Sequence, residues 1–270
     1  MEHRESEQRF SSRSAFLISA LGIAVGTGNI WRFPRIAATN GGDEGAGAFL
    51  VAWVIFLFLW SIPLIIAEYI MGRKSRKGTV GAFVSLVGGK FAWMGGFVGL
   101  VTTAITFYYS VVVGWCIYYF IQMLSKPLPA TTEASWSLWN NFQASALPLF
   151  FHGMAMAVGA LAIWRGVSSI EKVNKVLIPT LLAIVVLCVI RALTLPGAWN
   201  GVAYLFTPQW SQLSNPKLWL EALTQNAWDT GAGWGLFLTY AIYIRRRYGI
   251  VKNAFVTAIG NNIVSLLAAL

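Results

Sequence analysis

Residues 224–235 read TQNAWDTGAGWG, and residues 15–34 read AFLISALGIAVGTGNIWRFP. In both stretches several glycines follow closely on one another within an otherwise apolar segment. Glycine costs about 1 kcal/mol relative to alanine inside a helix, so both segments are expected to be interrupted helices. A membrane interior tolerates the freed backbone groups only where they line a buried cavity or bind something. The two stretches therefore predict a buried site formed by two broken helices.

The composition around these stretches is that of a membrane protein. Of the 270 residues, 57% are hydrophobic and 11% are charged, against roughly 25% charged in a soluble domain. The mean hydropathy of +0.62 points the same way, and a water-soluble globule is excluded. Apolar stretches near the length that crosses a bilayer, about 20 residues, predict spanning helices. They lie at 14–37, 47–71, 94–123, 148–165, 173–195, 218–244 and 250–270.

The basic residues predict the orientation of the chain. Lys and Arg number 20 against 10 Asp and Glu, for a formal charge of +10. Most of them fall on the side of the N-terminal tail, as in RKSRKG at 73–78 and RRR at 245–247. The positive-inside rule then places the N-terminus in the cytoplasm of a multi-pass protein of the inner (plasma) membrane. The charge is explained by topology, so nucleic-acid binding loses its support.

Asp229 is the residue that most strongly suggests function. A carboxylate in mid-membrane costs several kcal/mol unless it is paired, and no basic residue lies in the apolar core of the other spans. A small hard cation such as Na⁺, bound by carboxylate, amide and carbonyl oxygens, is the natural counter-charge. Gly22 and Gly26 alone, as a GxxxG pair, also fit simple helix packing. Two glycine-broken spans in corresponding halves instead favour an inverted-repeat transporter. No nucleophile, acid–base pair or metal cluster suggests an enzyme.

Several motifs together resemble the neurotransmitter:sodium symporters, in particular the bacterial sodium-dependent amino acid transporters. They are NGG at 40–42 after GTGNIWRFP, GAF at 47–49 with PLIIAEYIMGR at 63–73, FYYSVVVGW at 107–115 and TQNAWDTGAGWG. The resemblance implies an all-α integral membrane fold with two inverted five-helix repeats and broken first and sixth helices. The chain would hold a cytoplasmic tail (1–13), the first repeat (14–195), an extracellular loop (196–217) and the start of the second repeat (218–270).

The resemblance also implies two sodium sites. The first would consist of the Ala24 carbonyl, Asn29, Asp229 and Asn261, completed by the substrate carboxylate. The second would use carbonyls of Gly22 and Val25 together with ligands from a later span.

Chloride is not expected, because many family members have a hydroxyl residue where Asp229 stands and bind chloride beside it. Asp229 would supply that negative charge itself. Ser265 falls where some chloride-independent members have a carboxylate, and Trp53 falls where a chloride-binding tyrosine is expected.

The implied substrate is a neutral, hydrophobic or aromatic amino acid. Its carboxylate would meet the N–H groups of the glycine break and a tyrosine hydroxyl, and its amino group would meet freed carbonyls. The residues concerned are Ala24, Gly26, Thr27, Gly28, Ile105, Tyr109, Trp228, Gly231 and Trp234. Packing aromatics are the alternative for Tyr109 and for the two tryptophans.

Four residues are implied as gates or hinges. Arg32 would serve the extracellular gate, or else snorkel to the interface. Glu68 would bind the broken helices, or else sit at the cytosolic interface. Trp234 would close over the substrate, and Pro179 belongs to a hinge whose usual glycine is Ser169.

The N-terminal tail departs from the family. Where the family has an Arg and a Trp at its cytoplasmic gate, this tail has Glu7, Arg9 and Phe10.

The family's fold has twelve helices, and this chain is expected to stop within the seventh. The sequence therefore predicts sodium-coupled import of neutral amino acids by alternating access for the full-length type, and inactivity for this segment alone. Two alternatives remain: a non-transporting membrane fragment or pseudogene product, and a proton-coupled variant in which Asp229 titrates.

Overall fold

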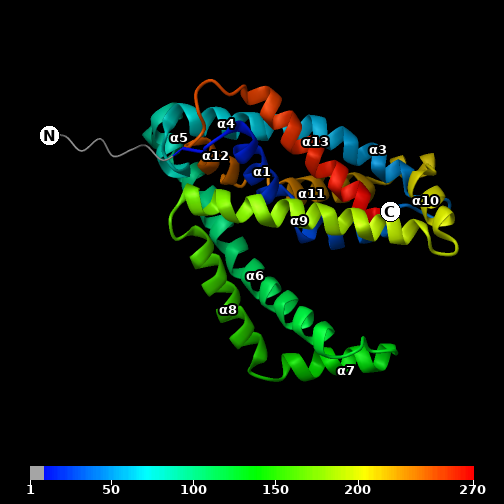
Figure 1. Ribbon diagram of the computed structural model, residues 1–270. Helices are drawn as coiled ribbons and strands as arrows, with labels where there is room; N and C mark the ends of the chain where they lie inside the picture. The colour runs from blue at the N-terminus through cyan, green and yellow to red at the C-terminus, as the bar shows by residue number, and fades with distance from the viewer. Residues whose placement is uncertain (1–8) are drawn as a thin grey trace. The chain divides into compact units, whose positions relative to one another are not determined.

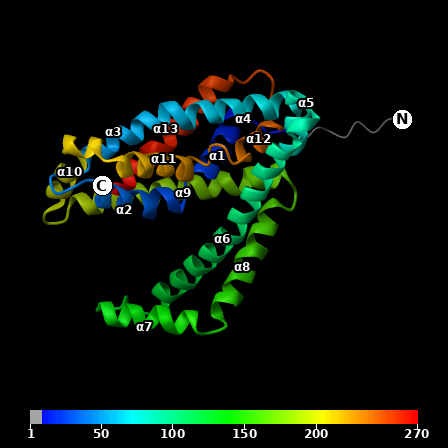
Figure 2. The ribbon, with the colours of Figure 1, turned by 180° about the vertical axis from the view of Figure 1, so that it is seen from behind.

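The computed structural model describes residues 9–270, and the described chain is built from helices in two units (Figures 1 and 2). The first unit contains residues up to Gly99 and from Ile170 onward, and the second contains Leu100–Ser169. Helix α6 (Ala92–Ser125) and helix α9 (Val167–Leu193) each cross from one unit into the other. The second unit otherwise consists of α7 (Thr132–Gln143) and α8 (Leu147–Ile163).

The first unit contains the remaining elements. Its longer helices are α1 (Arg13–Ala24), α2 (Phe33–Asn40), α3 (Gly47–Phe56), α4 (Ile62–Ser75), α5 (Thr79–Val87), α10 (Ala198–Phe206), α11 (Pro216–Thr230) and α13 (Ile250–Ala269). Shorter pieces are the π-helical turns η1 (Gly28–Arg32) and η2 (Leu57–Ser61), the 3₁₀ turns η3 (Gly89–Phe91) and η4 (Trp210–Ser214), and α12 (Leu236–Ala241).

The first predicted interruption is present. Helix α1 starts at the N-cap Ser12, whose hydroxyl accepts from the Ala15 N–H at 3.1 Å. It ends at Ala24, where Val25 takes an extended conformation. The chain then resumes as η1 and α2, bent by 52° from α1. The glycines around Val25 thus mark a real break in the backbone.

The second predicted interruption lies between α11 and α12. Gly231, Gly233 and Gly235 have φ values of +65°, +91° and +74°, in the left-handed region that side chains disfavour. Helix α11 therefore ends at Thr230, and α12 begins only at Leu236. Alternating glycines give a wide loop here rather than a kinked helix.

The broken helices are enclosed by their neighbours in the first unit. Helix α12 packs on α4, α11 packs on α3, and α13 runs against α1, η1 and α4. An apolar cluster packs α2 and α3 against α11, and in it the rings of Phe33 and Trp53 lie tilted to each other with centroids 4.4 Å apart. Both breaks are thereby brought to the same interior region.

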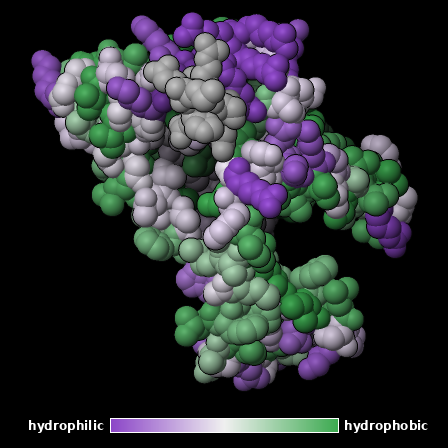
Figure 3. Space-filling view, turned by 60° about the vertical axis from the view of Figure 1, so that its left-hand side comes forward, coloured by the Kyte–Doolittle hydropathy of each residue, from purple (hydrophilic) through white to green (hydrophobic). Residues whose placement is uncertain are grey.

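Much of the remaining surface is apolar. Many large hydrophobic side chains are exposed, and they cover wide areas of the space-filling view (Figure 3). Within the described chain, four helices are long and apolar enough to cross a membrane, or up to six when each bent pair counts as one span. This is a membrane protein, in agreement with the sequence.

Three helices lie where the sequence led us to expect loops. Helix α7 lies in the polar connection after the third span, α10 lies in the connection after the fifth, and α5 follows the basic loop. All three are 12 residues or shorter, so a search for apolar stretches of spanning length passes over them.

Candidate functional site: the two helix breaks

Asp229 lies at the centre of the interior region, 2% exposed, in the last turn of α11. Its Oδ2 accepts from the Ser265 hydroxyl at 3.2 Å and from the Gln225 side-chain N–H at 3.3 Å. Its Oδ1 is buried and has no hydrogen-bond partner among the described residues. A buried carboxylate oxygen without a donor is costly, so this oxygen fits a cation ligand.

Other oxygens lie close by. One end of the Asn261 side-chain amide is 3.1 Å from the Ala24 carbonyl oxygen and 3.3 Å from the Asp229 carbonyl oxygen. When that end is the amide oxygen, three oxygens face one another, an arrangement that a cation between them would stabilise. When it is the nitrogen, the amide donates to both carbonyls instead. The donor set of amide, carbonyl and carboxylate oxygens is the one that hard cations use.

Asn29 joins the first break to helix α13. Its Oδ1 accepts from the Gly26 N–H at 2.8 Å, and its Nδ2 lies 2.8 Å from both Asn261 Oδ1 and Ser265 Oγ. The side chain is fully buried. The structure therefore brings together all four residues predicted for the first sodium site: Ala24, Asn29, Asp229 and Asn261.

Part of the predicted substrate pocket is assembled around the same breaks. The rings of Trp228 and Trp234 meet edge to face with centroids 5.6 Å apart. Gly28 lies against Trp228, because a Cβ at Gly28 would come within 3.0 Å of the indole Cδ1. A Cβ at Gly231 would come within 3.5 Å of Ile23.

Two predicted pocket residues, Ile105 and Tyr109, belong to the second unit. Their place in the substrate pocket stays a prediction.

Glu68, on α4, binds the second break. Its Oε1 accepts from the N–H groups of Gly233 at 2.6 Å and Gly235 at 3.1 Å, and its Oε2 accepts from Leu238 N–H at 3.0 Å. The side chain is buried. Glu68 thus occupies the N-terminal end of α12, where a negative charge is favoured by the helix dipole.

Arg32, at the end of η1, contacts two residues of α11. It forms an ion pair with Glu221 at 3.7 Å and a short hydrogen bond to Gln225 Oε1. Gln225 also donates to the Gly28 carbonyl at 3.1 Å. Glu221 and Gln225 were not predicted from the sequence, although Glu221, Gln225 and Asp229 follow one another at intervals of four residues and so share one helix face.

The structure also shows where the residues predicted for the second sodium site, for chloride and for the hinge lie. Val25 is buried at the break, and Gly22 faces Asn174 of α9. Trp53 is buried, and its indole N–H has no partner among the described residues. Helix α9 continues unbroken through Pro179. Glu7, in the tail, lies outside the described residues.

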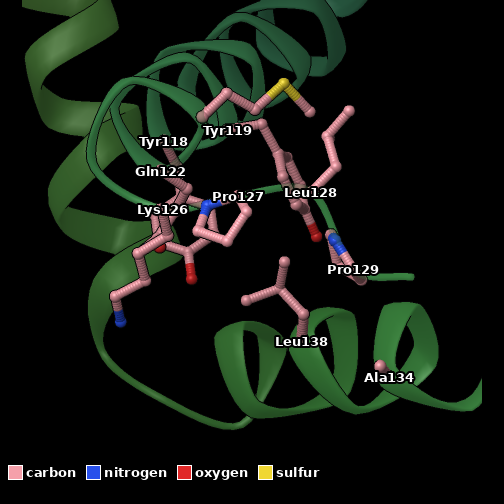
Figure 4. A pocket seen from close by; sticks show the side chains of 10 residues that line it. Tyr118, Tyr119, Gln122, Lys126, Pro127, Leu128, Pro129, Ala134 and Leu138 are labelled. Atoms are coloured by element: carbon pink, nitrogen blue, oxygen red, sulfur yellow. The ribbon is translucent and has the colours of Figure 1, made fainter. Parts of the chain in front are cut away.

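The second unit has a cavity of about 330 Å³ between the end of α6 and the start of α7 (Figure 4). It is lined by Tyr118, Tyr119, Gln122, Met123, Lys126, Pro127, Leu128, Pro129, Ala134 and Leu138. No residue predicted for substrate or sodium lines it. Tyr118 is buried here and stacks on Phe142 with centroids 3.9 Å apart, so it serves packing in this unit.

A family model, the sodium:neurotransmitter symporter family, matches residues 7–147 and 146–270. The chain belongs to this family. It is a family of transporters rather than of enzymes, and its sodium-dependent members agree with the coupling ion expected from the sequence.

Individual relatives are also described as sodium-dependent transporters. An uncharacterized sodium-dependent transporter of Methanocaldococcus jannaschii is 35% identical over 99% of this chain and 55% of its own length. The sodium-dependent neutral amino acid transporter B(0)AT3 of Mus musculus is 29% identical over 98% of this chain and 47% of its own length. The chain thus spans about half the length of these curated relatives.

Among solved structures, the crystal structure of MhsT in complex with L-phenylalanine is similar to this chain. It has a TM-score of 0.87 and 32% sequence identity, and the match covers 97% of this chain and 59% of that one. The expected transporter fold is therefore confirmed at the level of the shared helical architecture.

Proposed function

We propose that the whole protein is a sodium-coupled symporter that imports neutral, hydrophobic or aromatic amino acids by alternating access. The observation that carries the proposal is the buried Asp229 Oδ1, which has no donor among the described residues while the Ala24 carbonyl and the Asn261 amide lie around the same break. Ala24, Asn29, Asp229 and Asn261 would hold the first Na⁺. The carbonyls of Gly22 and Val25 would contribute to a second.

The substrate class rests on the lining of the pocket. Trp228, Trp234 and Gly28 present apolar surface and backbone groups. The charged side chains near the breaks other than Asp229 have partners of their own: Glu68 accepts from the N–H groups of Gly233, Gly235 and Leu238, and Arg32 pairs with Glu221. The start of η1, where N–H groups follow one another, suits an anionic carboxylate. The MhsT complex contains L-phenylalanine, which is consistent with an apolar substrate.

Several further features belong to the same proposal. The N-terminus would be cytoplasmic in the inner membrane, the first and second halves would be inverted repeats, and Tyr109 would donate to the substrate carboxylate. Arg32 and Trp234 would close the extracellular side. Transport would require the whole protein, and this segment alone would be inactive.

A binding screen on the full-length protein tests the proposal. In purified protein, one or more of the neutral apolar or aromatic amino acids should bind in Na⁺ and lose binding when choline replaces Na⁺. Asp229→Asn should abolish Na⁺-dependent binding, because the isosteric amide removes the charge that balances the cation. Asp43→Asn, at an exposed loop position, is the matched control.

Two outcomes would contradict parts of this proposal. Binding that is unchanged in Asp229→Asn would refute the site assignment. Uptake that persists unchanged in choline and instead follows a proton gradient would replace sodium coupling with the proton-coupled variant.

A further inference from the structure

Helix α8 carries a titratable side chain that the proposed function does not use. His152 lies within LPLFFHGMAMAVGALAI, the apolar sequence of α8 in the second unit. A polar or ionisable side chain inside a membrane-spanning segment is costly unless it has a partner, and by default it has a function. The contacts of His152 therefore indicate what it does.

His152 forms a hydrogen bond with Ser110 of α6. Its Nε2 lies 2.9 Å from the Ser110 hydroxyl oxygen, and Ser110 is only 9% exposed. The same hydroxyl oxygen lies 2.9 Å from the Phe107 carbonyl oxygen of its own helix. A serine hydroxyl has one proton, so both contacts are satisfied when Ser110 donates to Phe107 and accepts from the Nε2–H group of His152. His152 is then the donor that holds Ser110 from the neighbouring helix.

The two helices also approach each other closely one turn further along α6. A Cβ at Gly114 would come within 2.8 Å of the His152 backbone nitrogen and 2.9 Å of the Phe151 carbonyl carbon. One turn beyond, the rings of Tyr118 and Phe151 meet with centroids 5.5 Å apart. Ser110, Gly114 and Tyr118 are all buried. Spaced at intervals of four residues, they form the side of α6 that faces α8.

This contact sets the rotation of α6 about its own axis. With 3.6 residues per turn, successive residues of an α-helix are about 100° apart around the axis. Tyr109 directly precedes Ser110, so holding Ser110 against α8 turns Tyr109 about 100° away from α8. Ile105 lies one turn before Tyr109 and shares its side of the helix. The contact between α6 and α8 therefore determines the direction of both residues expected for the substrate pocket.

We propose that His152 is a positioning residue for substrate binding, because its hydrogen bond to Ser110 holds α6 in the rotation that presents the Tyr109 hydroxyl to the substrate carboxylate. The inference rests on the proposed function, in which Tyr109 donates to that carboxylate. Packing at Gly114 brings the two helices together. The hydrogen bond has a preferred direction, so it selects one rotation. His152 acts through Ser110 and Tyr109 and does not itself contact the substrate.

Two substitutions of His152 separate its hydrogen bond from its shape. His152→Phe keeps a ring of similar size without the N–H group, whereas His152→Gln keeps an N–H donor without the ring. Binding to the full-length protein in Na⁺ is measured with radiolabelled L-phenylalanine, or with another neutral amino acid selected by the binding screen. His152→Phe should raise the dissociation constant about three- to tenfold, the effect of one neutral hydrogen bond. His152→Gln should stay within twofold of the wild type.

A double-mutant cycle with Tyr109→Phe separates positioning from general damage to the protein. Tyr109→Phe leaves no hydroxyl to be presented to the substrate. Adding His152→Phe to Tyr109→Phe should therefore weaken binding by less than a further twofold. Damage to the fold alone would weaken binding by the same factor with and without the Tyr109 hydroxyl.

A cysteine on α8 reports on the helix contact without any substrate. Ala155 is 7% exposed and lies one turn beyond Phe151, on the buried side of α8. Ala155→Cys, in full-length protein with Cys116 and Cys188 replaced by serine, should react slowly with a polar thiol reagent while α8 packs on α6. Without Na⁺ or amino acid, the labelling rate should rise at least threefold in His152→Phe. It should stay within twofold of the parent in His152→Gln.

Ser110→Ala removes the same hydrogen bond from the other helix and should match His152→Phe in both measurements. It replaces His152→Phe should that variant fail to give monodisperse protein. Ser125→Ala is the matched control, because the exposed Ser125 also lies on α6 and its hydroxyl donates to the Ile121 and Gln122 carbonyls of its own helix. This control should leave affinity and labelling rate within twofold of the parent.

Three results overturn the positioning role of His152. They are an equal loss of affinity from His152→Phe with and without the Tyr109 hydroxyl, an affinity within twofold of the wild type in both His152→Phe and Ser110→Ala, and an unchanged labelling rate in both. Full-length wild type that binds no neutral amino acid in Na⁺ overturns the proposed function, and with it the role of Tyr109. The labelling of Ala155→Cys then still decides whether His152 holds α6 against α8.

Discussion

Asp229 shows how a single buried residue is divided between two tasks. Its Oδ2 is held by Ser265 and Gln225, and these hydrogen bonds fix the orientation of the carboxylate. Its Oδ1 is left without a donor among the described residues. In the function proposed above, the hydrogen bonds on one oxygen would hold the carboxylate so that the other could bind Na⁺.

Gly28 is the residue where the close approach of the two breaks can be tested. A Cβ there would come within 3.0 Å of Trp228 Cδ1 and 3.3 Å of Asp229 Cα. Gly28→Ala should therefore strain the contact and destabilise the protein by about 1–3 kcal/mol, the range of core overpacking. The measurement is thermal unfolding of the purified protein in detergent.

Gly26 supplies the matched control for that substitution. A Cβ at Gly26 would meet no atom within 4 Å. Gly26→Ala should leave the unfolding temperature close to that of the wild type. Equal unfolding temperatures for the two variants would contradict the packing of η1 against α11.

At the scale of elements, Glu68 accepts hydrogen bonds from backbone N–H groups at the break between α11 and α12, where the helix pattern is interrupted. Three N–H groups, from Gly233, Gly235 and Leu238, donate to its two carboxylate oxygens. In the Glu68→Gln variant the side chain keeps one acceptor oxygen, and its NH₂ group faces backbone N–H groups that are themselves donors. Glu68→Gln should therefore loosen the loop before α12, at a cost of about 1–3 kcal/mol for the unsatisfied buried groups.

Hydrogen–deuterium exchange measures that loosening. Peptides covering 231–238 should exchange faster in Glu68→Gln, while peptides from α13 change little. Glu44→Gln, at an exposed loop position, should leave both unchanged. If residues 231–238 exchange in Glu68→Gln at the same rate as in the wild type, the hydrogen bonds to α4 do not hold the break.

The sequence predicted the interruptions because glycine runs and a mid-span carboxylate are local signals. It also indicated Asn29 and Asn261 through the family resemblance. Glu221 and Gln225 were missed because polar residues near a helix end also fit an ordinary interfacial turn. Their roles depend on Arg32, which reaches them from a distant segment. Helices α5, α7 and α10 were missed because they are too short to be read as membrane spans.

At the scale of the whole molecule, we expect the charge on Asp229 to decide whether the full-length protein needs chloride. Ser265 and Gln225 both donate toward Oδ2, so without the carboxylate two donors would face a vacated anion position. Uptake by the full-length wild type should therefore be unchanged when chloride is replaced by gluconate. Asp229→Ser should lose most Na⁺-dependent uptake in gluconate and recover part of it in chloride, because a mobile anion can supply the missing charge beside Na⁺.

A second substitution separates this charge argument from simple damage to the site. In Asp229→Ser, adding Ser265→Glu returns a carboxylate to the neighbouring position on α13 and should restore uptake without chloride. Radiolabelled amino acid uptake into proteoliposomes, with Na⁺ fixed and the anion varied, measures all three proteins. Chloride dependence in the wild type, or equal uptake by Asp229→Ser in both anions, would show that Asp229 does not act as the fixed counter-charge.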